Sequence, residues 1–238
     1  MLNIQDRVVM VTGANGNLGS EVAKAFYEAG ARLALVGRKA ERVRNALPEL
    51  VSQDRVVVTP STDLTEDQAV HTLIDAVMET WGRIDVLANT VGGYRGGSSV
   101  HETSLETWDF MWTLNTRTAI LLSRAVVPVM LEQGSGKIIH TGSRNAQQGS
   151  RNSGAYSASK AGVLRLVESL SAEVKTKGVN VNCVLPGTID TSENRESMPN
   201  ADFSRWVDPH SIAQVFVFLA SDAAEAIHGA AIPVYGLS

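Results

Sequence analysis

The chain has 238 residues, a formal net charge of −4 and a single cysteine, Cys183. The small negative charge gives no broad electrostatic reason to bind nucleic acid or an anionic membrane. One cysteine excludes an intramolecular disulfide and suits a reducing compartment. The N-terminal residues lack the basic-then-apolar order of a signal peptide, and the longest apolar stretches are too short or too polar to span a bilayer. We therefore expect a cytoplasmic protein with no nucleic-acid or membrane partner.

Short β-rich runs alternate along the chain with longer segments of helical apolar period. The pattern predicts strands at 7–12, 32–36, 55–59, 84–88, 137–141, 179–185 and 231–234, and helices at 18–29, 40–47, 66–81, 105–132, 155–177 and 209–220. This alternation implies an α/β fold with a doubly wound parallel sheet of about seven strands and helices on both faces. We expect residues 1–238 to form a single domain. The irregular segment 188–207 is long for a compact domain and is predicted to cover a site.

The first predicted strand ends in a glycine-rich turn, TGANGNLG at residues 12–19, which runs into an amphipathic helix. Glycine permits a tight turn and close approach of the backbone to a pyrophosphate, which then rests on the helix N-terminus. A position in the first strand–helix unit makes this pattern a stronger sign of a dinucleotide site than an isolated glycine motif, and the alternative is an ordinary glycine-rich turn. We predict that the contacts come from Gly13, Asn15, Asn17, Leu18 and Gly19.

The end of the second predicted strand reports on the ribose of that dinucleotide. An acidic residue there favours a free 2′-hydroxyl, whereas arginine suits a 2′-phosphate. The chain has Arg38 and Lys39 at this point and no acid. We therefore predict NADP(H) as the preferred cofactor, with NAD(H) possible if Glu41 binds the ribose and both cations are simply solvated.

Tyr156 and Lys160 lie four residues apart in a predicted helix and so share one helical face. A phenol has an ordinary pKa of about 10, and a nearby cation lowers it. The pair therefore predicts a proton donor or acceptor that works near physiological pH.

Together with the glycine turn, these residues make the chain resemble the short-chain dehydrogenase/reductase family over essentially its whole length. Ser143 precedes Tyr156 by the family's usual thirteen residues, and Asn115 occupies the place of its helix asparagine. The resemblance implies a Rossmann-like fold and hydride transfer between a nicotinamide and a carbonyl or secondary alcohol substrate. It implies that Tyr156 is the general acid or base, that Lys160 lowers its pKa and holds the nicotinamide ribose, that Ser143 bonds the substrate oxygen, and that Asn115 positions water.

Further cofactor contacts are implied by the family's other motifs. They are Asp63 and Leu64 after the third strand, Asn89 and Gly92 in the Asn-Thr-Val-Gly segment after the fourth, and Pro186, Gly187, Ile189 and Thr191 after the sixth.

Three features depart from the family pattern. Asn17 replaces the second glycine of the usual turn, and Gly16 instead gives the spacing of the extended branch of the family, which modifies sugar nucleotides. Asparagine tolerates the positive φ that glycine supplies, so we interpret Asn17 as a tolerated substitution. Thr90 and Val91 alter the third motif, and a tail containing Tyr235 replaces the usual Asp-Gly-Gly ending.

We predict an NADP(H)-dependent carbonyl reductase or alcohol dehydrogenase. One alternative is a sugar-nucleotide epimerase or dehydratase, which the glycine spacing favours and the absence of an added substrate domain opposes. Another is a dinucleotide-sensing protein without turnover, which we would expect to lack Tyr156 or Lys160.

The sequence gives less information on the substrate and on assembly. Side chains predicted to reach the substrate are Tyr94, Arg144, Gln147, Arg151 and Trp206. An arginine here either recognises an acidic group on the substrate or is a solvated loop residue. The histidines show no metal-ligand spacing, and we expect no metal site. Trp108, Trp112 and the apolar stretch 119–130 indicate a helix buried on more than one side. In the resembled family this helix and the Tyr156 helix form a subunit interface, so the resemblance implies a homodimer or homotetramer. The alternative is a long helix that packs only on its own sheet.

Overall fold

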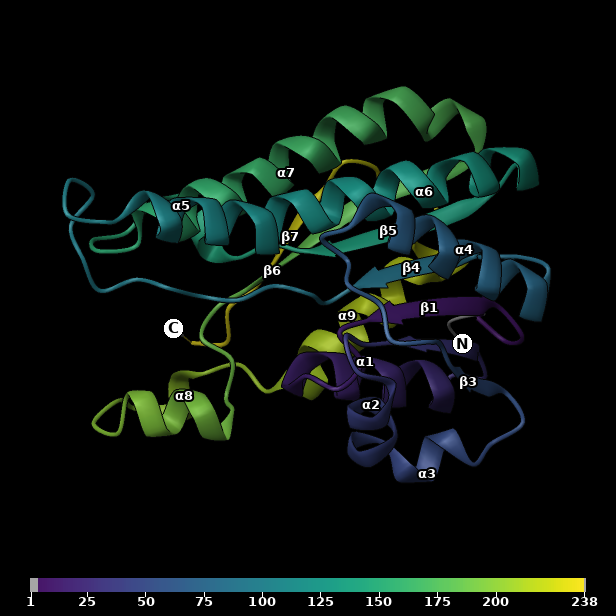
Figure 1. Ribbon diagram of the computed structural model, residues 1–238, viewed down its shortest axis with the longest axis horizontal. Coiled ribbons are helices and arrows are strands. Elements are labelled where there is room, and N and C mark those ends of the chain that lie inside the picture. The colour runs from purple at the N-terminus through teal and green to yellow at the C-terminus, as the bar shows by residue number, and fades with distance from the viewer. Residues whose placement is uncertain (1–3, 238) are drawn as a thin grey trace.

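The computed structural model describes residues 4–237, which form a three-layer α/β arrangement (Figure 1). All strands run parallel in the order β3-β2-β1-β4-β5-β6-β7. They are β1 (Val8–Thr12), β2 (Arg32–Val36), β3 (Val56–Val58), β4 (Val86–Asn89), β5 (Gly136–Thr141), β6 (Val179–Pro186) and β7 (Ala231–Val234). The predicted doubly wound parallel sheet is confirmed.

Helices cover both faces of this sheet. They are α1 (Asn17–Glu28), α2 (Ala40–Ala46), α3 (Pro48–Val51), α4 (Asp67–Trp81), α5 (Leu105–Met111), α6 (Thr118–Gln133), α7 (Gly154–Val174), α8 (Ser192–Ser197) and α9 (Pro209–Ala220). Figure 1 shows α4, α6 and α7 on one face and α1 and α9 on the other.

The alternation of side chains along β1 divides the core into two. Val9 and Val11 pack with Phe26 of α1 and Phe216 of α9, whereas Met10 belongs to the cluster beneath α4, α6 and α7. β1 is thus apolar on both sides, as a central parallel strand between two helical layers requires. Full burial of a side chain such as Phe26 contributes about 1.5–3 kcal/mol.

Three local features differ from the prediction. The predicted helix 105–132 is interrupted by a π-helical turn, Trp112–Arg117, between α5 and α6. The predicted irregular segment 188–207 contains α8, which Thr191 caps by accepting a hydrogen bond from the Asn194 N–H at 3.2 Å. α3 also had no counterpart among the predicted helices.

Segment 188–207 leaves the sheet and returns to it beside its starting point. Ile189 and Val207 form a parallel bridge, with hydrogen bonds from Asp190 N to Val207 O at 2.8 Å and from Val207 N to Thr188 O at 2.9 Å. We call residues 190–206 the α8 arm. The closed base fixes where the arm starts and ends, and Figure 1 shows α8 standing away from the sheet. Among residues 4–237, no helix combines the length and apolar character needed to cross a bilayer.

Candidate active site

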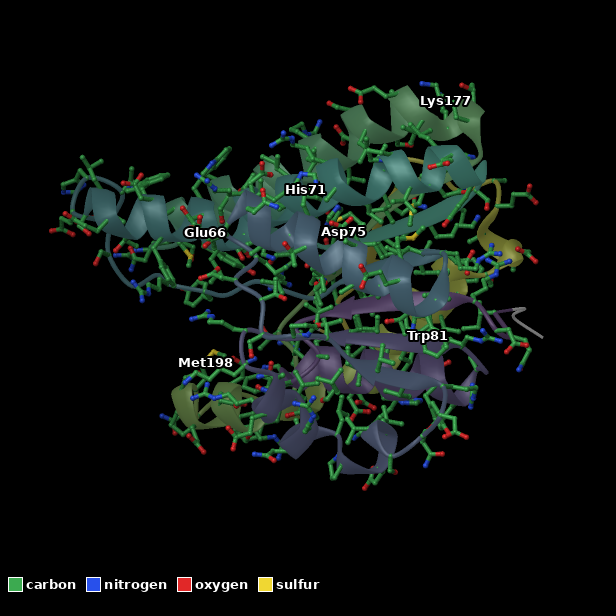
Figure 2. All side chains as sticks on the ribbon, turned by 45° about the vertical axis from the view of Figure 1, so that its right-hand side comes forward. Glu66, His71, Asp75, Trp81, Lys177 and Met198 are labelled. Atoms are coloured by element: carbon green, nitrogen blue, oxygen red, sulfur yellow. The ribbon has the colours of Figure 1, made fainter. Side chains whose placement is uncertain are left out.

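A cavity of about 820 Å³ lies at the carboxyl ends of β1, β4, β5 and β6 and is closed on one side by the α8 arm. The strand order reverses between β1 and β4, the place where open α/β sheets bind ligands. Figure 2 shows Met198, which lines this cavity, on the side of the α8 arm that faces the rest of the molecule.

Most of the predicted site residues line this cavity. They are Gly13, Asn17, Leu18, Gly19, Gly92, Tyr94, Ser143, Arg144, Tyr156, Lys160, Pro186, Gly187, Ile189 and Thr191. The cavity lining does not include Asn15, Arg38, Asp63, Leu64, Asn89, Asn115, Gln147, Arg151 or Trp206.

The glycine turn brings its backbone close to the start of α1. A Cβ on Gly19 would lie 2.1 Å from the Gly13 carbonyl oxygen, so the turn closes this tightly only with glycine at position 19. Gly16 is the residue before α1 and supplies no side-chain cap to the first N–H groups of the helix. These N–H groups can therefore hold an anion, which is the feature that a dinucleotide pyrophosphate requires.

Arg38 follows β2 at the far end of the same edge and is exposed. The Asp63 carboxylate accepts hydrogen bonds from the backbone and side chain of Thr65, which lower the pKa of Asp63, and the positive charge of Arg38 lowers it further. Leu64 beside it is buried. The Asn15 side-chain oxygen approaches the backbone of Gly37, so the turn and the β2 end adjoin.

Asn89 is committed to a buried hydrogen-bond chain instead of the cavity. Its Oδ1 accepts from Thr12 Oγ1 at 2.7 Å and from Val91 N at 3.2 Å, and its Nδ2 donates to His140 Nδ1 at 3.0 Å. His140 Nε2 then lies 3.0 Å from Ser123 Oγ, which fixes the neutral ring with its proton on Nε2. Burial and, second, the charge of Lys160 lower the His140 pKa to about 4.

The π-helical turn points the Asn115 amide at the irregular segment that follows β4. Its Oδ1 accepts from Gly93 N at 3.0 Å, and its Nδ2 donates to Gly93 O at 3.1 Å and to Ser159 Oγ at 3.0 Å. A π turn inserts one residue into the helical repeat and often marks a functional position. Asn115 thereby ties the cavity wall at Gly93 to the helix that carries Tyr156.

Tyr156 and Lys160 lie on one face of α7, with Ser143 opposite them at the end of β5. Ser143 hydrogen-bonds the Tyr156 phenol, and Lys160 Nζ donates to Thr141 O at 2.8 Å. Gly92 completes this wall: a Cβ there would lie 2.7 Å from Lys160 Nζ and 2.8 Å from Asn115 Oδ1. Three of the four predicted catalytic side chains, Ser143, Tyr156 and Lys160, therefore meet at one wall of the cavity, and Asn115 supports that wall from behind.

The pKa values of the pair differ from the simple expectation. Burial lowers the pKa of Lys160 to about 8, since only 3% of the residue is exposed. Burial also raises the pKa of Tyr156, with the Ser143 hydrogen bond opposing that shift and Tyr94 adding to it. The sequence analysis expected Lys160 to lower the pKa of Tyr156, whereas in this structure burial of the phenol raises it.

The predicted substrate residues divide into two groups. The Tyr94 ring packs edge-on against Tyr156 with centroids 5.0 Å apart, and Arg144 lines the cavity with its guanidinium 5.6 Å from the Tyr235 ring. Gln147 accepts a hydrogen bond from Tyr235 Oη at 2.8 Å, outside the lining. Trp206 packs on Phe203 within the α8 arm, and Arg151 is an exposed loop residue.

The unusual tail is held by the same chain. Tyr235 reaches Gln147, while Leu237 N donates to Arg205 O at 2.9 Å and Arg205 Nε donates to Leu237 O at 3.1 Å. The tail therefore ties the segment after Ser143 to the base of the α8 arm.

Sequence reasoning missed several lining residues. They are Gly16, Thr90, Thr141, Gly142, Asn145, Ser150, Ser153, Glu193, Asn194 and Met198. A signal for α8 was present, because Thr191 followed two residues later by Glu193 is typical of a capped helix start. Within the described part of the chain, no three His, Cys, Asp or Glu side chains gather as a metal site would need.

Comparisons with known proteins identify the family of the chain. The family model described as short chain dehydrogenase matches residues 7–202. An uncharacterized oxidoreductase of Staphylococcus aureus strain MW2 is 32% identical over 218 residues, which cover 92% of each chain. One from Staphylococcus haemolyticus is 30% identical over 94% of this chain and 95% of its own.

Two solved structures share the whole fold. The crystal structure of gox2181 superposes with a TM-score of 0.92 at 30% identity, covering 98% of this chain and 95% of its own. A short-chain type dehydrogenase/reductase from Mycobacterium ulcerans gives 0.93 at 27% identity, covering 99% and 90%. Sequence, fold and the Ser143–Tyr156–Lys160 arrangement together show that the chain belongs to the short-chain dehydrogenase/reductase family of oxidoreductases.

Proposed function

We propose that the protein is an NADP(H)-dependent oxidoreductase that interconverts a carbonyl compound and a secondary alcohol. The family implies a nicotinamide dinucleotide as cofactor. The observation that carries the proposal is the convergence of Ser143, Tyr156 and Lys160 on a cavity whose other end is the glycine turn. When bound, the nicotinamide supplies or accepts the hydride.

The residues present fit such a cofactor. The uncapped start of α1 and the backbone of the glycine turn would hold the pyrophosphate, and the segment from Pro186 to Thr191 would line the nicotinamide end. Lys160 would hold the nicotinamide ribose from the base of the cavity, as the family resemblance implies. An ammonium with a pKa of about 8 remains charged at neutral pH, so it can serve both as donor and as counter-charge.

Tyr156 is assigned the proton transfer. In reduction its phenol O–H donates to the oxygen of the substrate carbonyl, and the phenolate left behind is stabilised by Lys160 and then takes a proton from solvent. Ser143 donates a hydrogen bond to the same substrate oxygen while negative charge develops there. Asn115 holds the wall at Gly93 and would position water for the proton's return.

Replacing Tyr156 by Phe tests this assignment. Turnover of a panel of aldehydes and ketones should fall by about 10²–10⁴-fold, since a positioned general acid contributes that much. Binding of NADPH, followed by nicotinamide fluorescence, should be kept. Unchanged turnover in the variant would remove Tyr156 from the chemistry, and absence of turnover in the wild type across the panel would favour a non-catalytic dinucleotide sensor.

The NADP preference rests on Arg38 at the end of β2, where no acidic residue stands. A paired titration with NADPH and NADH should show tighter binding of NADPH, and Arg38→Ala should remove the difference. Arg44→Ala is the matched control, since Arg44 is an exposed arginine on the neighbouring α2. Preference for NADH in the wild type would overturn the cofactor assignment and leave the catalytic one in place.

We also propose that two copies associate through α6 and α7. A shallow apolar groove of about 270 Å³ runs between these helices and includes Ile120, Val127, Leu166 and Leu170. In the family this helix pair forms a subunit interface. Sedimentation should show a dimer or tetramer, and Leu170→Asp should lower the mass to that of the monomer.

A further inference from the structure

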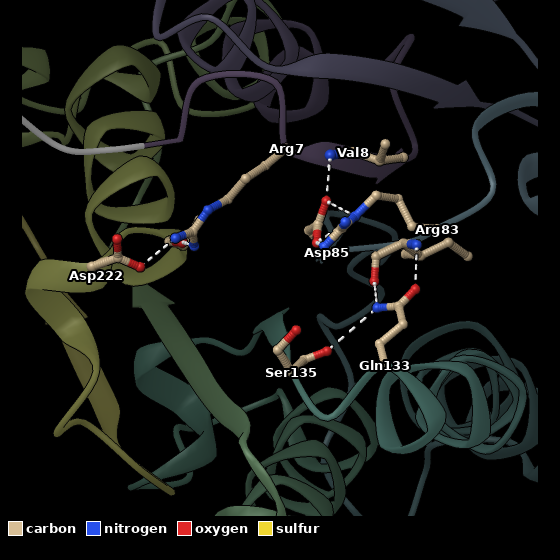
Figure 3. A network of polar contacts seen from close by, with 9 residues as sticks. Arg7, Val8, Arg83, Asp85, Gln133, Ser135 and Asp222 are labelled. Atoms are coloured by element: carbon tan, nitrogen blue, oxygen red, sulfur yellow. Dashed lines mark hydrogen bonds and ion pairs between the residues drawn. The ribbon is translucent and has the colours of Figure 1, made fainter.

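A second cavity, of about 600 Å³, lies at the amino ends of the strands, at the opposite edge of the sheet from the active site. Figure 3 shows part of its wall. Arg7 pairs with Asp222 on one side, and Arg83 pairs with Asp85 on the other. None of these four residues lines the active-site cavity.

Three of the four acidic side chains that line this cavity, Asp6, Asp85 and Asp222, form ion pairs, and the fourth, Glu225, is exposed. Asp85 accepts hydrogen bonds from Arg83 Nε at 3.0 Å, from Arg83 Nη2 at 2.6 Å and from Val8 N at 2.8 Å. Asp222 forms its ion pair with Arg7, which also donates to Ala220 O at 2.8 Å. The remaining lining acids are Asp6, which pairs with Arg32, and the exposed Glu225.

Lys137, at the start of β5, is a buried lysine of this cavity with no carboxylate at ion-pair distance within residues 4–237. Only 9% of the residue is exposed, and it forms no ion pair with any residue from 4 to 237. Its Nζ donates one hydrogen bond, to the neutral side-chain oxygen of Asn180 at 2.7 Å. An ammonium has three donors, so two remain for a ligand in the cavity.

Burial and a neighbouring cation destabilise the charged form of Lys137. Burial lowers the pKa of Lys137, and the positive charge of Arg7 lowers it further, against smaller opposing effects of Glu225 and Asp222. The Asn180 side chain is held in one orientation, because its Nδ2 donates to Glu225 O at 2.8 Å and to Ile227 O at 3.0 Å. Lys137 therefore faces the neutral amide oxygen of Asn180. A buried cation in this state is stabilised by an anion that accepts its free donors.

We propose that this cavity binds a small oxyanion, a carboxylate or an inorganic phosphate, with Lys137 as its charged anchor. The site lies at the opposite end of β5 from the active site, so both can be filled at once. Thr141, at the other end of that strand, accepts the hydrogen bond from Lys160.

Isothermal titration of the whole protein with succinate, and separately with inorganic phosphate, tests the proposal. At least one of them should bind, and which one does assigns the class of oxyanion. Lys137→Met keeps the packing of the side chain and should weaken binding by about tenfold or more, the usual effect of losing a hydrogen bond to a charged group. Lys175→Met is the matched control: Lys175 is an exposed lysine of the same cavity, and its removal should change the affinity by less than about threefold.

A second variant keeps the proposal testable if Lys137→Met fails to fold. Asp222→Asn releases Arg7 from its carboxylate at a position whose side chain is 58% exposed, and it should tighten binding. Two results would overturn the proposal. One is the absence of binding of either anion to the wild type. The other is an affinity that neither Lys137→Met nor Asp222→Asn changes in the expected direction, which would place the anion elsewhere, the glycine turn included.

Discussion

The side-chain amide of Asn17 donates a hydrogen bond to a carboxylate oxygen of Glu193 at 2.6 Å. Asn17 is the residue that departs from the family's glycine pattern, and Glu193 belongs to α8, whose presence the sequence analysis did not predict. The contact joins the start of α1 to the α8 arm across the mouth of the cavity. It also places a carboxylate beside the backbone that is proposed to hold the cofactor's pyrophosphate.

Replacing Glu193 by Gln should therefore tighten cofactor binding. The pKa of Glu193 is lowered, first by a hydrogen bond from its own backbone N–H and next by Asn17, so the side chain is charged at neutral pH and repels a pyrophosphate. Because the group is exposed, the expected gain in NADPH affinity is about two- to fivefold. Fluorescence titration measures it. Glu196→Gln removes an equal charge from the same helix, and an equal effect there would show that Glu193 acts only through net charge.

Stability should depend on pH through His140. Its pKa is about 4 in the folded protein and about 6.5 in the unfolded chain, so the unfolded chain binds the extra proton between these values. The contribution of His140 to the free energy of unfolding is complete above pH 6.5 and is lost as pH falls to 4, by roughly 3 kcal/mol.

Denaturant unfolding of the wild type and of His140→Gln from pH 7 to pH 4 measures that loss. Glutamine can bond Asn89 and Ser123 but does not titrate, so the variant should lose less stability on acidification. His101→Gln, at an exposed position, controls for removal of a histidine. Parallel curves for wild type and His140→Gln would show that the ring is not held neutral.

The fold could be predicted because short buried strands alternate regularly along the chain with longer amphipathic helices. Residues 32–36 and 231–234 form strands with the predicted bounds, since short apolar runs between turn residues favour buried strands. Tyr156 and Lys160 were predicted to share one helical face from their spacing, and Ser143 was placed beside them by the family resemblance.

The predictions failed where the local sequence pattern does not determine which way a side chain points. The π turn at Trp112–Arg117 adds a residue without breaking the run of helix-forming residues, so the phase shift that aims Asn115 at Gly93 left no trace in composition. Gln147 and Trp206 were predicted to reach the substrate but turn toward Tyr235 and Phe203. Contacts between segments far apart in the sequence determine the orientation of such loop side chains, and a single sequence does not reveal these contacts.

The two candidate arginines should behave differently toward acidic substrates. Arg144 lines the cavity and forms no ion pair within residues 4–237, whereas Arg151 is exposed outside the lining. For carbonyl substrates that carry a carboxylate, Arg144→Ala should raise KM by about tenfold and leave kcat nearly unchanged. Arg151→Ala should change neither value. An unchanged KM in Arg144→Ala for every accepted substrate would show that the arginine is a solvated loop residue.

Gly92 should be required for activity because of what it adjoins. An alanine Cβ would lie 2.7 Å from Lys160 Nζ and 2.8 Å from Asn115 Oδ1, so at least one of these groups must move. A displacement of about 1 Å at a catalytic group can cost about 100-fold in rate, and we expect a loss of that order in kcat/KM for Gly92→Ala. Gly149→Ala is the control, since a Cβ there meets its nearest atom, on Ser157, at an ordinary 3.9 Å. Full activity in Gly92→Ala would mean that Lys160 can shift without cost, and that its position against Thr141 is not what the proton transfer requires.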